Sequence, residues 1–176
     1  MQSRLARQLA EAAAALHDIE APFALIGGLA LASHGVVRGT IDIDFLVDAA
    51  AAERVERLLV GLGYRPAHRS EDAATYIRAD ERVDLLYAHR PIALALLAQA
   101  REVAGTMRPL RVVSAEGLVA FKLQGLVNDP RRTQDLEDIR ALLRANRASL
   151  DMAEVRGYFR LFDREGQLDE LLDEIR

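Results

Sequence analysis

The order of hydrophobic and polar residues divides the chain into a region of short strands and a later region of helices. Hydrophobic residues spaced three and four apart predict a first amphipathic helix, which Ser3 caps and Ala21-Pro22 ends. Short apolar or alternating runs bounded by turn residues predict strands. These strands are expected at residues 23–26, 40–47, 75–78, 82–87 and 109–113.

Helical patterns separate the later strands and then replace them. A short helix is expected over residues 29–34, and longer ones over 50–62, 92–103, 115–127, 133–146, 151–162 and 168–175. Ser114, Thr133 and Asp151 stand where side chains cap helices. The pattern predicts an α+β fold, with a small mixed β-sheet and its flanking helices in residues 1–113 and a helical region in residues 114–176 packed on that core.

The amino-acid composition excludes several kinds of site and argues against some classes of binding partner. The chain has no cysteine, which excludes disulfides, thiolate zinc sites and a cysteine nucleophile. Its 23 basic and 27 acidic residues give a net charge of −4, which argues against general binding of polyanions. No apolar run reaches the length of a membrane span, and charged residues interrupt the first twenty positions, unlike a signal peptide. We therefore expect a soluble, cytoplasmic protein with no membrane partner.

Two acidic residues stand close together in the second predicted strand. In Ile41-Asp-Ile-Asp-Phe45, the side chains of Asp42 and Asp44 point to one face because strand side chains alternate. Such a pair is self-repelling, and a divalent cation between the carboxylates relieves the repulsion. The alternative is an edge strand whose outer face is simply solvated.

Two further features strengthen the cation interpretation. Gly27-Gly28 follows a strand and precedes a helix, where bare backbone N–H groups can approach a phosphate. Asp84 is a lone acid in a later strand and joins Asp42 and Asp44 if the two strands are neighbours. Three carboxylates beside a phosphate-binding turn describe a two-metal site for phosphoryl transfer.

The same motifs resemble a known superfamily. Phe23-Ala-Leu-Ile-Gly-Gly-Leu-Ala-Leu-Ala-Ser-His-Gly35, followed by Arg38-Gly-Thr-Ile-Asp-Ile-Asp-Phe45, is similar to the opening motif of DNA polymerase β-like nucleotidyltransferases. The nearest match is the bacterial branch of AbiEii-type toxins from type IV toxin–antitoxin systems. Lys122, the one lysine among the 23 basic residues, and the stretch 132–139 match later signatures of that branch. The resemblance covers residues 20–145. Gln134 departs from it, because many relatives have a basic residue there, and Gly-Gly replaces the superfamily's Gly-Ser.

The resemblance implies a role for each matching residue. Asp42, Asp44 and Asp84 would be the catalytic acids and would hold Mg²⁺ or Mn²⁺. The turn Gly27-Gly28 would bind the phosphates of an NTP. The roles of five further residues are implied or left open. Arg38 contacts a phosphate or is a surface arginine, and Lys122 contacts the triphosphate or an acceptor or is a solvated or salt-bridged lysine. Arg132, Asp135 and Asp138 either contact substrate or form salt bridges between helices.

The implied activity is metal-dependent transfer of an NMP from an NTP to an acceptor hydroxyl. The acceptor could be an RNA 3′ end such as that of tRNA, a protein side chain, or a small molecule such as an aminoglycoside or lincosamide. As a toxin, the protein would also have an antitoxin partner. The alternative is a non-catalytic nucleotide- or partner-binding module of the same fold.

Overall fold

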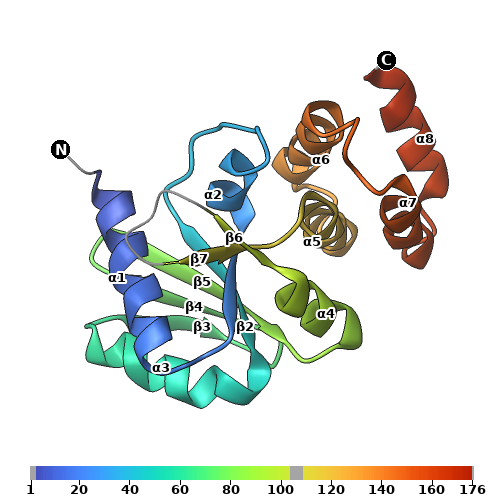
Figure 1. Ribbon diagram of the computed structural model, residues 1–176. Helices are drawn as coiled ribbons and strands as arrows, with labels where there is room; N and C mark the ends of the chain where they lie inside the picture. The colour runs from blue at the N-terminus through green and yellow to red at the C-terminus, as the bar shows by residue number, and fades with distance from the viewer. Residues whose placement is uncertain (1–2, 104–108, 176) are drawn as a thin grey trace. The chain divides into compact units, whose positions relative to one another are not determined.

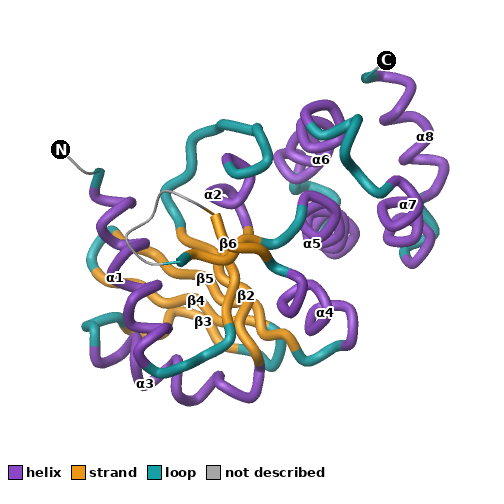
Figure 2. The backbone as a smooth tube through the Cα atoms, in the orientation of Figure 1, coloured by secondary structure: helices purple, strands orange, loops and turns teal. Residues whose placement is uncertain are grey.

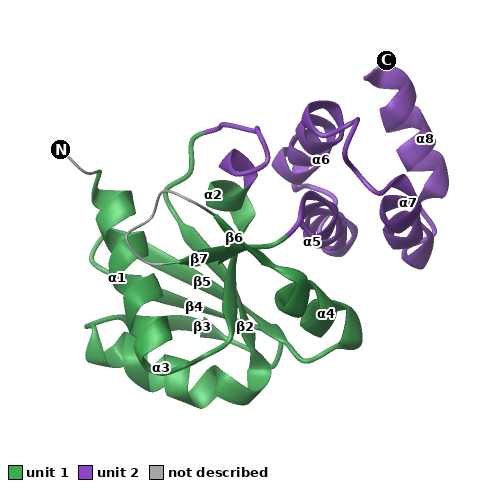
Figure 3. Cartoon of the chain, in the orientation of Figure 1, with its two compact units in different colours: residues 1–30, 39–113 green, residues 31–38, 114–176 purple. Residues whose placement is uncertain are grey.

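The computed structural model describes residues 3–103 and 109–175 and divides into two compact units (Figure 3). The first unit consists of residues 1–30 and 39–113. The second consists of residues 31–38 and 114–176, so a short segment after Ala30 groups with the C-terminal helices. The sequence pattern gave no sign of this grouping, because nothing local to residues 31–38 refers to helices almost a hundred residues away.

Seven strands in the described part of the first unit form one mixed sheet, in the order β3-β4-β5-β2-β1-β7-β6 (Figures 1 and 2). Strand β2 pairs in parallel with β5, and β1 pairs in parallel with β7, whereas the other neighbours are antiparallel. The α+β class and mixed sheet are therefore confirmed. The strands are β1 (Phe23–Ile26), β2 (Ile43–Asp48), β3 (Arg65–Arg69), β4 (Ala73–Arg78), β5 (Glu81–Ala88), β6 (Arg101–Val103) and β7 (Leu110–Val112).

Helices flank this sheet and fix which of its faces is apolar. In Figure 1, α1 and α3 lie side by side, and α4 lies apart from them. The His17 ring of α1 meets the Phe23 ring, which in turn meets the Phe45 ring edge-on at 5.4 Å. The face of β2 that carries Phe45 is thus packed against α1, and Asp44 belongs to the opposite face. The helical segments of this part of the chain are α1 (Arg4–Asp18), α2 (Gly27–Ala32), a 3-10 turn (Ala49–Ala51), α3 (Ala52–Gly61) and α4 (Pro91–Gln99).

Four helices make up most of the second unit: α5 (Ala115–Asn128), α6 (Thr133–Ala145), α7 (Met152–Leu161) and α8 (Glu165–Glu174). Helix α5 packs against α6 and α7, and Leu123 of α5 and Ile139 of α6 are fully buried. Ser114 and Asp151 cap α5 and α7 by accepting backbone N–H hydrogen bonds, as expected. Thr133 does not cap α6, because it is already the first residue of that helix.

Three sequence-based boundaries were wrong, and the first two affect the site. The strand expected over 40–47 begins at Ile43, so Asp42 precedes it. Helix α2 begins at Gly27 itself rather than after the glycines. The helix expected over 92–103 ends at Gln99, and residues 101–103 form β6. In addition, β3 was missed because its residues are all exposed and lack the apolar alternation that marks a strand.

The helices in the described ranges are all too short or too polar to cross a bilayer.

Candidate active site

The Asp44 and Asp84 residues face each other across two neighbouring strands. They are register partners in the parallel pair β2–β5, so their side chains leave the same face of the sheet. This is the face opposite to Phe45 and α1, and both side chains are partly buried. The two acids were expected to meet if their strands were neighbours, and β2 and β5 are neighbours.

Asp42 approaches the same region from just outside β2. It stands two residues before Asp44. One side chain, that of Arg82, interacts electrostatically with all three acids. The pKa of Arg82 is raised, first by its hydrogen bonds to Asp84, against the opposing effect of burial, and further by the charges of Asp84, Asp42 and Asp44. The charges of all three acids therefore act on one guanidinium, which contacts Asp84 directly.

The glycine turn lies directly against this cluster. Ile26 is the register partner of Asp44, and Gly27 follows it with a φ of +67°, a conformation that residues with a Cβ rarely adopt. A Cβ added at Gly27 would overlap the Asp44 carboxylate and come within 2.7 Å of the Cβ of Asp44. Both the backbone conformation and the space require glycine at this position.

Asp84 is held in place by two further side chains on the same face. The Thr75 hydroxyl donates to Oδ1 of Asp84 over 2.5 Å, from the register-paired position on β4. Arg82 donates through Nε to Oδ2 over 2.7 Å and through Nη2 to Oδ1 over 3.1 Å. Sequence reasoning missed both residues. Arg82 was detectable, since it stands two residues before Asp84 and strand side chains repeat every two residues.

The acids suit a hard divalent cation in donor type, because Mg²⁺ and Mn²⁺ prefer carboxylate oxygens. Asp44 and Asp84 also suit one in strand register. However, within residues 3–103 and 109–175, no group of three or more His, Asp or Glu side chains is arranged to hold an ion. Both oxygens of Asp84 instead accept hydrogen bonds from Arg82.

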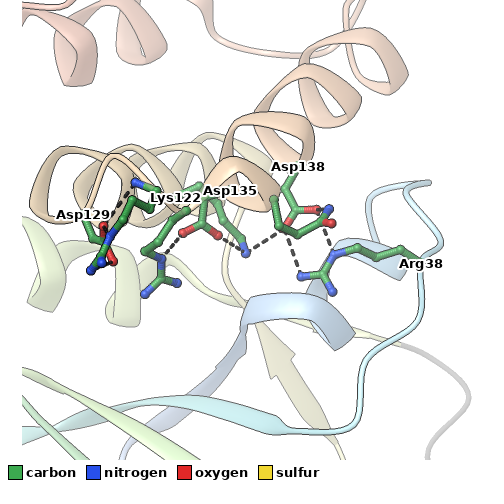
Figure 4. A network of polar contacts seen from close by, with 8 residues as sticks. Arg38, Lys122, Asp129, Asp135 and Asp138 are labelled. Carbon is green, nitrogen blue, oxygen red and sulfur yellow. Dashed lines mark hydrogen bonds and ion pairs between the residues drawn. The ribbon is translucent and has the colours of Figure 1, made fainter.

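A second group of charged residues forms a chain of ion pairs within the second unit, which we call the ion network (Figure 4). Lys122 on α5 donates to Asp135 over 2.8 Å and to Asp138 over 2.7 Å, and both acids are on α6. Arg38 donates through two nitrogens to the two oxygens of Asp138, and Arg132 donates through Nε to Asp135. The ion network consists of Arg38, Lys122, Arg132, Asp135 and Asp138.

The centre of the ion network is almost completely buried. The side chains of Asp135 and Asp138 are 5% and 2% exposed, and that of Lys122 is 11% exposed. Burial by itself would raise the pKa of Asp138, but hydrogen bonds from Arg38 and Lys122 outweigh it and leave the pKa below its usual value. Asp138 is therefore an ionised carboxylate whose charge these cations balance.

This geometry decides between the structural alternatives left open by the sequence. Asp135 and Asp138 do form salt bridges between helices, and Lys122 is the residue that joins them. Lys122 is not a solvated helix lysine, and Arg38 is not a simple surface arginine. Gln134, at the position where many relatives are basic, donates to Asp138 over 3.0 Å. The roles of Arg38, Lys122, Arg132, Asp135 and Asp138 toward a substrate stay predictions.

Gly125 on α5 is the glycine that the ion network requires. A Cβ there would lie 2.9 Å from Oδ2 of Asp135 and 3.3 Å from Nε of Arg132. The Asp135–Arg132 ion pair thus packs directly on the bare backbone of α5. The sequence signal for this contact was weak, because an isolated glycine in a helix has many possible causes.

Residues 1–161 match the model of a family described as uncharacterised nucleotidyltransferases. The chain belongs to this nucleotidyltransferase family. No curated protein matches the chain. The nucleotidyltransferase expected from the motifs is therefore confirmed, and the particular AbiEii-type branch stays a prediction.

Solved structures share the fold of this nucleotidyltransferase. A solution structure of the antibiotic-resistance factor ANT(2'')-Ia superposes with a TM-score of 0.68 at 19% identity, covering 96% of each chain. The lincosamide antibiotic adenylyltransferase LnuA, with lincomycin bound, has a TM-score of 0.57 at 17% identity, covering 77% of this chain and 94% of its own. At these identities the likeness concerns the fold alone.

Proposed function

We propose that this nucleotidyltransferase moves an NMP from an NTP to an acceptor hydroxyl in a metal-dependent reaction. The observation that carries the proposal is the register pairing of Asp44 with Asp84 on the face beside Gly27. In such a reaction the acceptor oxygen bonds to the α-phosphorus, and the bond from that phosphorus to the pyrophosphate oxygen breaks.

Asp42, Asp44 and Asp84 are the residues that would hold Mg²⁺ or Mn²⁺. The cation would supply positive charge to the phosphate oxygens as pyrophosphate leaves. The contact between Asp44 and Gly27 supports adjacent cation and phosphate sites, since one residue of each touches the other.

Gly27 and Gly28 would bind the phosphates through backbone N–H groups. They are the first two residues of α2, and the first N–H groups of a helix have no acceptor within it. A bare backbone allows an anion to approach closely. These two glycines thus suit binding of the NTP phosphates.

Asp84 would orient the acceptor hydroxyl and accept its proton. Its carboxylate is fixed by Thr75 and Arg82, so its direction is set before substrate binds. A fixed carboxylate within reach of the attacking hydroxyl lowers the entropic cost of the reaction. Release of the proton to Asp84 would balance formation of the new oxygen–phosphorus bond.

The test is transfer of label from each of the four α-³²P-NTPs in Mg²⁺ to three acceptor pools: total RNA including tRNA, total protein, and a panel of aminoglycosides and lincosamides. We expect one pool to become labelled and Asp44→Asn and Asp84→Asn to abolish the labelling. Glu53→Gln, which changes an exposed acid on α3, is the matched control and should label like the wild type. Labelling by Asp44→Asn at the wild-type rate would exclude the mechanism. NTP binding without labelling of any pool would favour a non-catalytic binding module.

If RNA or protein is labelled, the second question is whether the protein acts as a toxin. Expression of the wild type but not of Asp44→Asn should then arrest growth, and the product of a neighbouring gene should relieve the arrest. Labelling of an antibiotic instead would make it a resistance enzyme, an outcome for which ANT(2'')-Ia and LnuA offer a structural parallel.

A further inference from the structure

Arg82 occupies a distinctive position in the acid cluster of Asp42, Asp44 and Asp84. It stands on β5 two residues before Asp84, so its side chain leaves the sheet on the same face as that acid. Its guanidinium contacts both oxygens of Asp84, an arrangement in which one planar fork covers one carboxylate edge.

The contacts of Asp84 leave limited room for another cation. Oδ1 accepts hydrogen bonds from Thr75 and from Nη2 of Arg82, and Oδ2 accepts one from Nε of Arg82. A carboxylate offers about four acceptor positions in total, so three are in use. A divalent cation at Asp84 would also stand beside a guanidinium of the same sign of charge, and the two would repel.

The Arg82 side chain can move away from Asp84. Its side chain is 49% exposed, whereas that of Asp84 is 23% exposed. An arginine of this exposure regains hydration when its ion pair breaks, and the pair itself is stabilised only modestly. Thr75 also donates a hydrogen bond to the acid, so Asp84 can keep its place while the arginine moves.

We infer that Arg82 is the built-in counter-ion of the acid cluster and that it competes with the divalent cation for Asp84. This inference rests on the proposed function, because it takes the acids to be the cation site. When the metal binds, its charge then replaces that of Arg82 at Asp84. The three acids therefore remain partly neutralised both with and without metal. Loss of Arg82 should therefore tighten metal binding.

Isothermal titration with Mn²⁺ in the absence of nucleotide tests the competition. We expect Arg82→Gln to bind Mn²⁺ roughly threefold to tenfold more tightly than the wild type, the range for loss of a partly exposed competing ion pair. Arg90→Gln is the control, because it removes one positive charge from an exposed arginine paired with Asp72. It should change the affinity by less than about twofold, since exposed charges far apart are screened.

The outcomes separate the two proposals. Equal or weaker Mn²⁺ binding by Arg82→Gln, with the wild type and Arg90→Gln both binding, would overturn the competition and leave the proposed function standing. Absence of Mn²⁺ binding in every variant, at any concentration that leaves the protein folded, would overturn the proposed function itself. Asp44→Asn should abolish this Mn²⁺ binding, which would show that the ion binds at the acid cluster.

A second measurement keeps the inference testable if Arg82→Gln does not fold. The Nε–H resonance of Arg82 in the wild type, assigned by its absence in Arg82→Lys, should be slow to exchange without metal because Asp84 accepts that hydrogen. Saturating Mg²⁺ should shift the resonance and speed its exchange. An Arg82 resonance unchanged by saturating Mg²⁺ would show that the pair stays intact and that no competition occurs.

Discussion

Gly27 and Asp44 are in such close contact that no side chain fits between them. Gly27 directly follows β1 and is the first residue of α2, and Asp44 is on β2, the antiparallel neighbour of β1. The contact places the first backbone N–H groups of α2 beside one of the three acids of the cluster. It also makes the conformation of the turn and the position of the carboxylate depend on each other.

We expect Gly27→Ala to lower the free energy of unfolding by about 1–3 kcal/mol, because a positive φ strains alanine and its methyl group would displace Asp44. Mn²⁺ binding should be lost at the same time. Chemical denaturation and metal titration measure the two effects. The matched control is Gly157→Ala within α7, where nothing lies within 4 Å of an added Cβ. That variant should gain about 0.5–1 kcal/mol from helix propensity.

Metal should stabilise the folded protein through the acid cluster. We expect Mg²⁺ or Mn²⁺ to raise the melting temperature of the wild type, since the cation binds the native state and relieves repulsion among the acids. Asp42→Asn should be more stable than the wild type without metal and should gain less from its addition. Differential scanning fluorimetry over a metal series measures both. Equal responses of the two proteins would show that Asp42 is not part of the site.

Lys122 is expected to matter for stability, in contrast to an exposed helix lysine. Lys122→Ala leaves two nearly buried carboxylates without their shared partner and should cost about 3 kcal/mol or more. Lys122→Arg should also be destabilised, because a planar fork cannot place one ammonium between both acids. Urea denaturation measures the loss, and Arg131→Ala, an exposed arginine outside the ion network, should stay within about 0.5 kcal/mol. A change below 1 kcal/mol for Lys122→Ala would contradict the burial of this pair.

The NTP affinity of the same variants addresses a separate prediction. If the Lys122 ammonium contacts the triphosphate, variants that remain folded should bind MgATP or another NTP about 1.5–3 kcal/mol more weakly, the scale of a charge-assisted hydrogen bond. Calorimetry at a temperature well below the melting point separates this effect from unfolding. Unchanged affinity would leave Lys122 with its structural role alone.

Asp138 gives the ion network a defined pH dependence. Its pKa is lowered in the folded protein, so it binds its proton less readily there than in the unfolded chain. The resulting stability is therefore fully present above the ordinary pKa of an aspartate and is lost as the pH falls through the folded value. The difference in unfolding free energy between the wild type and Asp138→Asn should be largest near pH 6–7 and shrink below about pH 4. A difference that stayed constant down to pH 3 would show that the charge of Asp138 is not what stabilises the fold.

The sequence by itself determined the features that depend on neighbouring residues. Hydrophobic periodicity located β1, β5 and most helices, and capping chemistry placed Ser114 and Asp151, because these signals act over a few positions. Gly27-Gly28 and the acids at 42, 44 and 84 indicated a site for phosphoryl transfer from residue types and spacing alone. The resemblance of residues 23–45, Lys122 and residues 132–139 to known motifs then indicated a nucleotidyltransferase.

Tertiary structure alone decided how distant residues meet. The sequence named Asp44 and Asp84, but only the β2–β5 register placed them on one face beside Arg82. It singled out Lys122 without showing that the residue is buried between two acids of α6. Strand pairing and helix packing are set by the whole hydrophobic core rather than by local preference, so these contacts could not be derived from any single stretch of sequence.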